Sequence, residues 1–144
     1  MKATDILGIW EIVIRPSGKL NDIYGNEYER GLAIWIARWN AGHEKSWAWV
    51  KYNINNEYEY LQSDLVLVPS NNTTNFDTIL DFYGDGKLLG SYEFRATDLP
   101  IKVAVNVSGV NELKIYFHDN EYTGWGTRLG LANCRLSYEL DESY

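Results

Sequence analysis

The sequence of 144 residues contains one cysteine, one methionine and three prolines, and it has no long apolar run. A single cysteine excludes an intrachain disulfide and a cysteine-rich zinc site. The apolar stretch at residues 32–36 is interrupted at Arg38, far short of the ~20 residues that cross a bilayer, so no transmembrane helix is expected. The first residues carry one lysine but no apolar segment with a cleavage site, so no secretory signal is predicted.

Basic residues are also scarce, with 13 Lys and Arg against 20 Asp and Glu, which gives a formal net charge of -7. Proteins that bind nucleic acid or anionic membranes concentrate positive charge on one face, so neither partner is expected. The length suits one domain spanning residues 1–144, with enough chain for one core and no room for a second.

Aromatic residues, in contrast, make up 15% of the chain, with six Trp and eleven Tyr. Period-two alternation recurs almost everywhere, separated by turns rich in Asn and Gly, which predicts an all-β fold. The expected strands are 9–14, 31–39, 46–54, 58–68, 76–83, 87–94, 101–106, 112–118 and 129–138. That number of strands is sufficient for a two-sheet antiparallel β-sandwich.

Two short turns and three apolar stripes refine this expectation. Polar residues 53–56 and the Gly84-Asp85-Gly86 turn each separate two strand patterns, and both predict hairpins. Alternate apolar positions within single strands predict core faces. These positions are Leu61, Leu65 and Leu67, then Val103, Val105 and Val107, and then Leu113, Ile115 and Phe117.

A third hairpin is predicted where residues 34–39 (IWIARW) and 47–50 (WAWV) flank a polar loop. If the isoleucines of the first strand and Ala48 and Val50 of the second face the core, every tryptophan points to the other face. Four tryptophans then share one outer surface: Trp35, Trp39, Trp47 and Trp49. Trp39 would lie opposite Trp47, and Trp35 opposite Lys51. The reverse parity, with tryptophans in the core, remains open for each of them.

An exposed cluster of indoles suits a sugar ligand, because a pyranose ring has an apolar face and a hydroxylated rim. Polar side chains in or beside the loop would hydrogen-bond the rim, namely Arg38, Asn40, His43 and Glu44. The polar segment 118–128 carries Tyr122 and Trp125 and is a second candidate contact, although it also suits a structural loop.

Residues for catalysis are sparse. The three acidic residues Glu44, Asp119 and Glu121 are best explained as solvated loop carboxylates, and the two histidines have no nucleophile motif near them. We therefore expect no enzyme activity and no cofactor. Oxygen ligands at Asn21, Asp22 and Asn26 leave a structural calcium open, but the metal is not assigned.

Four segments occur in an order that resembles a known family: 22–28 (DIYGNEY), 51–58 (KYNINNEY), 81–87 (DFYGDGK) and 103–109 (VAVNVSG), followed by Leu113. The chain resembles the NPCBM-like group of carbohydrate-binding modules, which is related to the galactose-binding jelly rolls. The likeness extends from about residue 20 to residue 138 and covers turn and strand residues of the scaffold. It does not include the tryptophan-rich segment 35–49, so no ligand residue is transferred onto that segment.

The resemblance implies a β-sandwich module attached to secreted bacterial glycoside hydrolases or surface proteins. The sequence thus predicts an extracellular, noncatalytic carbohydrate-binding module within a larger multidomain protein, with a glycan or polysaccharide as its ligand. The alternative is a protein-interaction or adhesion module that uses the same aromatic patch as its interface.

Overall fold

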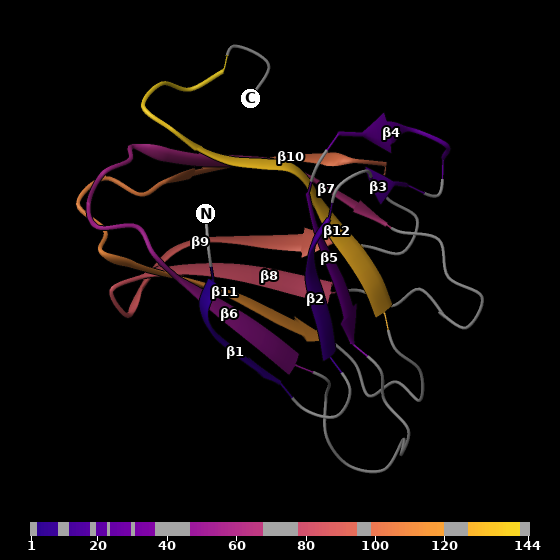
Figure 1. The fold of residues 1–144 in the computed structure, drawn as a ribbon, viewed down its shortest axis with the longest axis horizontal. Helices are drawn as coiled ribbons and strands as arrows, with labels where there is room; N and C mark the ends of the chain where they lie inside the picture. The colour runs from indigo at the N-terminus through magenta and orange to yellow at the C-terminus, as the bar shows by residue number, and fades with distance from the viewer. Residues whose placement is uncertain are drawn as a thin grey trace.

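The computed structural model describes residues 3–8, 12–17, 20–22, 24–29, 31–36, 47–67, 78–94, 99–119 and 127–141. These residues form antiparallel strands and turns, and none of them lies in a helix. The strands build two five-stranded sheets that face each other (Figure 1). The predicted two-sheet antiparallel β-sandwich is therefore confirmed.

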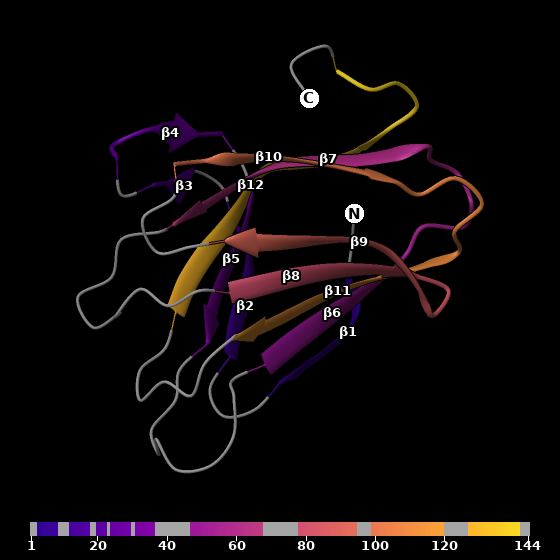
Figure 2. The same ribbon diagram turned by 180° about the vertical axis from the view of Figure 1, so that it is seen from behind.

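Sheet A consists, in spatial order, of β1 (Ala3–Gly8), β6 (Trp47–Asn53), β11 (Glu112–Asp119), β8 (Thr78–Gly84) and β9 (Lys87–Phe94). Figure 2 shows these five strands side by side, from β9 at the upper edge to β1 at the lower edge. Sheet B consists of β10 (Ile101–Asn106), β7 (Tyr60–Leu67), β12 (Thr127–Ser137), β5 (Gly31–Ile36) and β2 (Ile12–Ser17).

The core between the sheets is built from alternate residues of each strand. The predicted stripe in β11 is fully buried, and the stripe that begins in β10 is no more than 3% exposed. Leu61 and Leu65 of β7 are also fully buried and join the same core cluster, whereas Val66 packs in a second cluster. The predicted parity is therefore confirmed in β10 and β11 and at Leu61 and Leu65, while the side chain of Leu67 lies outside the description. Each such side chain contributes about 1.5–3 kcal/mol through the apolar area that it removes from water.

The predicted hairpins have different outcomes. β8 and β9 pair through the Gly84-Asp85-Gly86 turn, where Asp85 and Gly86 have φ angles of 49° and 84°, so this hairpin is confirmed. The hairpin at residues 53–56 is wrong, because β6 belongs to sheet A and β7 to sheet B. Asn55 and Asn56 do make a turn, with φ angles of 52° and 56°, but it carries the chain from one sheet to the other.

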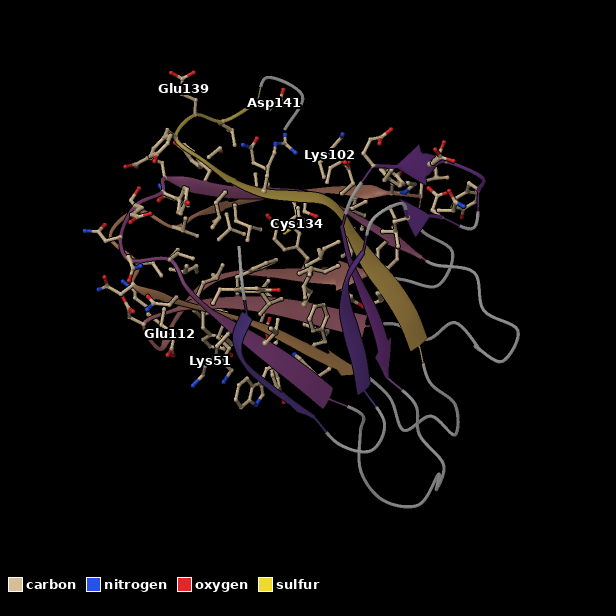
Figure 3. The ribbon with its side chains drawn as sticks, viewed as in Figure 1. Lys51, Lys102, Glu112, Cys134, Glu139 and Asp141 are labelled. Carbon is tan, nitrogen blue, oxygen red and sulfur yellow. The ribbon has the colours of Figure 1, made fainter. Side chains whose placement is uncertain are left out.

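The outer face of sheet B is covered by two further segments. The small hairpin of β3 (Leu20–Asn21) and β4 (Glu27–Tyr28) places Leu20 and Tyr28 against Val66 and Ala132. The segment after β12, where Glu139 and Asp141 are labelled in Figure 3, is tied to β7 through Gln62. The Gln62 Nε2 atom donates to the Glu139 carbonyl at 3.1 Å, and its Oε1 atom accepts from the Asp141 N–H at 2.8 Å.

Candidate functional site

The outer face of sheet A carries aromatic and charged side chains at the positions that alternate with the core. In β6, Val50 and Tyr52 are buried, while Trp49 and Lys51 lie half-buried on the opposite face. The same alternation places Lys114, Tyr116 and His118 of β11 on this face, and Asp81 and Tyr83 of β8. Lys51 and Glu112, labelled in Figure 3, extend from this face away from sheet B.

The strand register brings these side chains together in rows across the sheet. Trp49 pairs with Tyr116, which in turn pairs with Asp81 of β8. One row along, Lys114 lies between Lys51 and Tyr83. Directly opposed and diagonal neighbours in an antiparallel sheet are close enough for aromatic and long side chains to touch. Residues from three strands therefore form one continuous surface.

This surface contains an open hollow of about 330 Å³ lined by Trp49, Tyr83, Lys114 and Tyr116. We call it the aromatic hollow. Its lining combines three aromatic rings with one amine and two phenolic hydroxyls. Such a lining offers flat apolar area for burial together with directed hydrogen-bonding groups.

The amine of Lys114 lies among the three rings. Its Nζ atom is 5.5 Å from the centroid of the Trp49 ring, 5.4 Å from that of Tyr83 and 5.5 Å from that of Tyr116. A cation within about 6 Å of a ring centroid is attracted by the negative face of the ring. The amine of Lys114 is thus attracted by three ring faces at once.

A chain of polar contacts adjoins the hollow. The Asp81 carboxylate lies 2.9 Å from Nε2 of His118 through Oδ2 and accepts a hydrogen bond from Ser91 Oγ at 2.6 Å through Oδ1. The His118 ring lies 4.9 Å from the Tyr116 ring, centroid to centroid. Burial raises the pKa of the Tyr116 hydroxyl, and the neighbouring Tyr83 and Asp81 raise it further. Tyr116 therefore presents a neutral hydroxyl at physiological pH, able both to donate and to accept.

The tryptophan hairpin predicted from the sequence is wrong. Trp35 lies in β5 of sheet B, where it pairs with Val13 and Arg128, whereas Trp47 and Trp49 lie in β6 of sheet A. Segments 31–36 and 47–53 therefore do not pair, and Trp35 does not lie opposite Lys51. Trp47 pairs instead with His118, beside the row of Trp49 and Tyr116.

Of the predicted site residues, Trp49 is the one whose side chain the structure places, and it lines the aromatic hollow. For Trp35 and Trp47, the structure gives the position in the strand but not the placement of the side chain. The remaining candidates lie outside the described residues: Trp39, Asn40, His43, Glu44, Tyr122 and Trp125. Their roles stay predictions.

Sequence reasoning missed Tyr83, Lys114 and Tyr116 as site residues. Their signal was present, since Lys114 and Tyr116 fill the positions between the buried residues of the predicted core stripe at 113–117. If the outward-facing positions of every predicted strand are treated as candidates, Lys114 and Tyr116 are both included. Parity alone would not have joined them to Trp49, because that requires the pairing of β11 with β6.

Among the described residues, no group of three or more His, Cys, Asp or Glu side chains is arranged to hold a metal ion. At the suggested calcium ligands, Asp22 instead accepts hydrogen bonds from Tyr24, Asn26 and Tyr28, which fixes the turn between β3 and β4. A structural calcium at this turn therefore stays unassigned. In the described part of the chain, no helix is long and apolar enough to span a bilayer.

Comparison with known proteins shows the class of fold. No family model and no curated protein matches this chain. The CBM51 carbohydrate-binding module of Clostridium perfringens GH95, solved with methyl-galactose, is similar over 95% of both chains, with 15% identity and a TM-score of 0.66. The CBM51-2 and INT domains of C. perfringens ZmpB are similar over 96% of this chain and 30% of that one, with 13% identity and a TM-score of 0.67.

A longer C. perfringens ZmpB structure, with the M60 catalytic domain and both CBM51 domains, is similar at 12% identity and a TM-score of 0.69. The match covers 96% of our chain but 14% of that one, so our chain spans less than a third of the first ZmpB chain and about a seventh of the second. Structural neighbours of this protein are thus β-sandwich carbohydrate-binding modules. At these identities the likeness establishes the fold.

Proposed function

We propose that this protein is a noncatalytic carbohydrate-binding module of the NPCBM-like type, and that a pyranose ring of its glycan ligand stacks in the aromatic hollow. The observation that carries this proposal is the arrangement of Trp49, Tyr83 and Tyr116 around an open hollow on a five-stranded sheet. The similarity in fold to carbohydrate-binding modules supports it.

The chemistry of the hollow suits a sugar. The indole of Trp49 offers an apolar face to the C–H side of the ring, and the two tyrosine hydroxyls offer donors and acceptors to the rim. Because these residues lie on paired strands, little conformational entropy is lost when the ligand binds. Trp47, two residues before Trp49 in β6, is the predicted extension of the platform.

The role follows from the setting of related folds. One similar structure carries two CBM51 domains in the same chain as a catalytic domain. By analogy, we propose that this single module belongs to a secreted or cell-surface bacterial protein and holds that protein at polysaccharide. A module of this kind binds with Kd values of roughly 1 mM to 1 μM, and attachment to a larger protein raises its effective concentration at the glycan.

The test is a screen of the purified protein against a glycan array, followed by titration of hits with Trp49→Ala. We expect this variant to bind at least about tenfold more weakly, because it loses the stacking surface. Tyr138→Ala is the matched control, since Tyr138 is 68% exposed and stacks with Tyr58, away from the hollow.

Equal loss in both variants, or none in Trp49→Ala, would reject the hollow as the binding site. A folded protein that binds no glycan but self-associates or captures a protein partner would support the interaction module instead. A reducing-sugar assay on the bound polysaccharides checks the noncatalytic assignment, because release of new reducing ends would contradict it.

A further inference from the structure

Among the residues that the structure describes, Lys114 is the one charged residue that lines the aromatic hollow, and its position restricts the ligand. Its amine lies between 5.4 and 5.5 Å from the centroids of three rings, so rings replace part of the water around it. Aromatic faces attract a cation but carry no net charge. The positive charge of Lys114 is therefore held in the hollow without being neutralised by its walls.

Neighbouring charges do not neutralise it either. In the described part of the chain, no ion pair includes Lys114. The residue directly opposite on β6 is Lys51, a like charge, whose amine lies 3.5 Å from Glu112 Oε1 and 5.0 Å from the centroid of the Trp49 ring. The Asp81 carboxylate, on the same face, is hydrogen-bonded to His118 and Ser91 rather than to Lys114. Like charges opposed across a sheet repel, so an anion placed beside Lys114 would relieve an unfavourable contact.

The net charge of the whole protein makes the position of Lys114 more informative about the ligand. With a formal net charge of -7, the molecule as a whole repels anions. A ligand that carries negative charge therefore needs a local positive group at its binding site. Lys114 supplies that group beside the ring of Trp49, which is the stacking surface for the sugar.

Building on the proposed function, we propose that the aromatic hollow binds an anionic pyranose, with its carboxylate or sulfate group on Nζ of Lys114 and its ring on Trp49. The contact is a charge-assisted hydrogen bond in a site shielded by three rings, which makes it stronger than a neutral one. Neutral sugars of the same stereochemistry would stack in the same hollow but would leave the amine without a partner.

The experiment uses the whole protein and two pairs of probes that differ in charge. Oligogalacturonate is compared with its methyl ester, and a sulfated galactan oligosaccharide with its desulfated form, by calorimetric titration at about 0.15 M salt. Lys114→Met removes the charge and retains most of the aliphatic stem. Lys102→Met is the matched control, because it removes one positive charge from the outer face of sheet B, where Lys102 lies 2.9 Å from Asp64.

We expect the wild-type protein to bind one charged probe at least about tenfold more tightly than its neutral counterpart. Lys114→Met should lose that preference while retaining affinity for the neutral probe, and Lys102→Met should change binding by less than about threefold. The probe pair with the larger preference identifies the anionic group as carboxylate or sulfate.

Three results would overturn the inference. If the wild type binds charged and neutral probes alike, or if both lysine variants lose affinity equally, Lys114 does not select an anion. In these cases the proposed function stands, provided that Trp49→Ala still weakens binding. If the folded protein, verified by its circular dichroism, binds no probe and no glycan of the array, both proposals fail.

Discussion

Replacing Asp22 with alanine should destabilise the protein by about 2–3 kcal/mol without weakening ligand binding in the aromatic hollow. Asp22 lies in the connection between β3 and β4, is 2% exposed, and forms the centre of that hairpin. The hairpin covers the outer face of sheet B, whereas the hollow lies on the outer face of sheet A. Stability and binding should therefore respond separately.

The magnitude follows from the bonds that the carboxylate accepts. Oδ1 accepts the N–H groups of Tyr24 and Asn26, each at 2.9 Å, and Oδ2 accepts Asn26 Nδ2 at 2.8 Å and the Tyr28 hydroxyl at 3.2 Å. Four bonds at about 0.5–1.5 kcal/mol each give an upper range of 2–6 kcal/mol. Tyr24 and Asn26 are exposed and regain water as a partner, so the lower part of that range applies.

Acid should reduce the difference between the variant and the wild type. Burial alone would raise the pKa of Asp22, but the hydrogen bonds from Asn26, Tyr24 and Tyr28 together hold it below its ordinary value of 3.8. A carboxyl group whose pKa is lowered by folding stabilises the native state above the unfolded pKa, and this contribution is lost as pH falls through the folded pKa. The difference should be full at neutral pH and shrink below pH 3.8.

Urea unfolding at several pH values measures this difference, and glycan titration of the same samples measures binding. Asn106→Ala is the control, because it removes one exposed hydrogen bond to the Ser108 N–H and should cost less than about 1 kcal/mol. The reasoning would be refuted by an Asp22→Ala variant within about 0.5 kcal/mol of the wild type, or by a difference that does not change with pH.

Two further predictions concern the core and its tyrosines. Gly84→Ala should lower the free energy of unfolding in urea by about 1–3 kcal/mol, because its Cβ would lie 2.5 Å from Val110 Cγ2. Gly90→Ala should cost less, because no neighbour would lie closer than 3.8 Å to its Cβ. Equal losses in the two variants would contradict this reasoning. Burial raises the pKa of the Tyr52 and Tyr116 hydroxyls above 10.0, so near-ultraviolet absorbance should show both ionising last, and stability should fall as pH rises above 10.0. If all tyrosines instead ionise together near their ordinary pKa, the raised pKa of Tyr52 and Tyr116 would be disproved.

The strands that the sequence predicted well are those with long, regular alternation. The expected ranges 87–94 and 101–106 coincide with β9 and β10, because alternation and flanking turns mark both ends. β3 and β4 were missed, since a strand of two residues has no periodicity to detect. β1 was missed as well, because residues 3–8 (ATDILG) do not alternate between polar and apolar types.

Pairing between strands was less accessible, because turn chemistry is local and sheet membership is not. The turn at Asp85 and Gly86 closes a hairpin, while the turn at Asn55 and Asn56, with the same left-handed backbone, connects two sheets. Both turns reverse the chain and both use residues that tolerate positive φ. What differs is where each following strand finds its partner, and β7 pairs with β10 and β12 rather than with β6.

The same distinction explains the partial success at the candidate site. Parity within β6 depends on the core alone, so the sequence correctly placed Val50 inside and Trp49 outside. The neighbours of Trp49 depend on pairing with β11, which lies about sixty residues further along the chain, so the sequence joined Trp49 to the wrong strand. Aromatic composition therefore predicts an exposed aromatic surface, but the register determines that its charged member is Lys114. Whether the aromatic hollow selects neutral or anionic sugars can therefore be asked only when the pairing of β6, β11 and β8 is known.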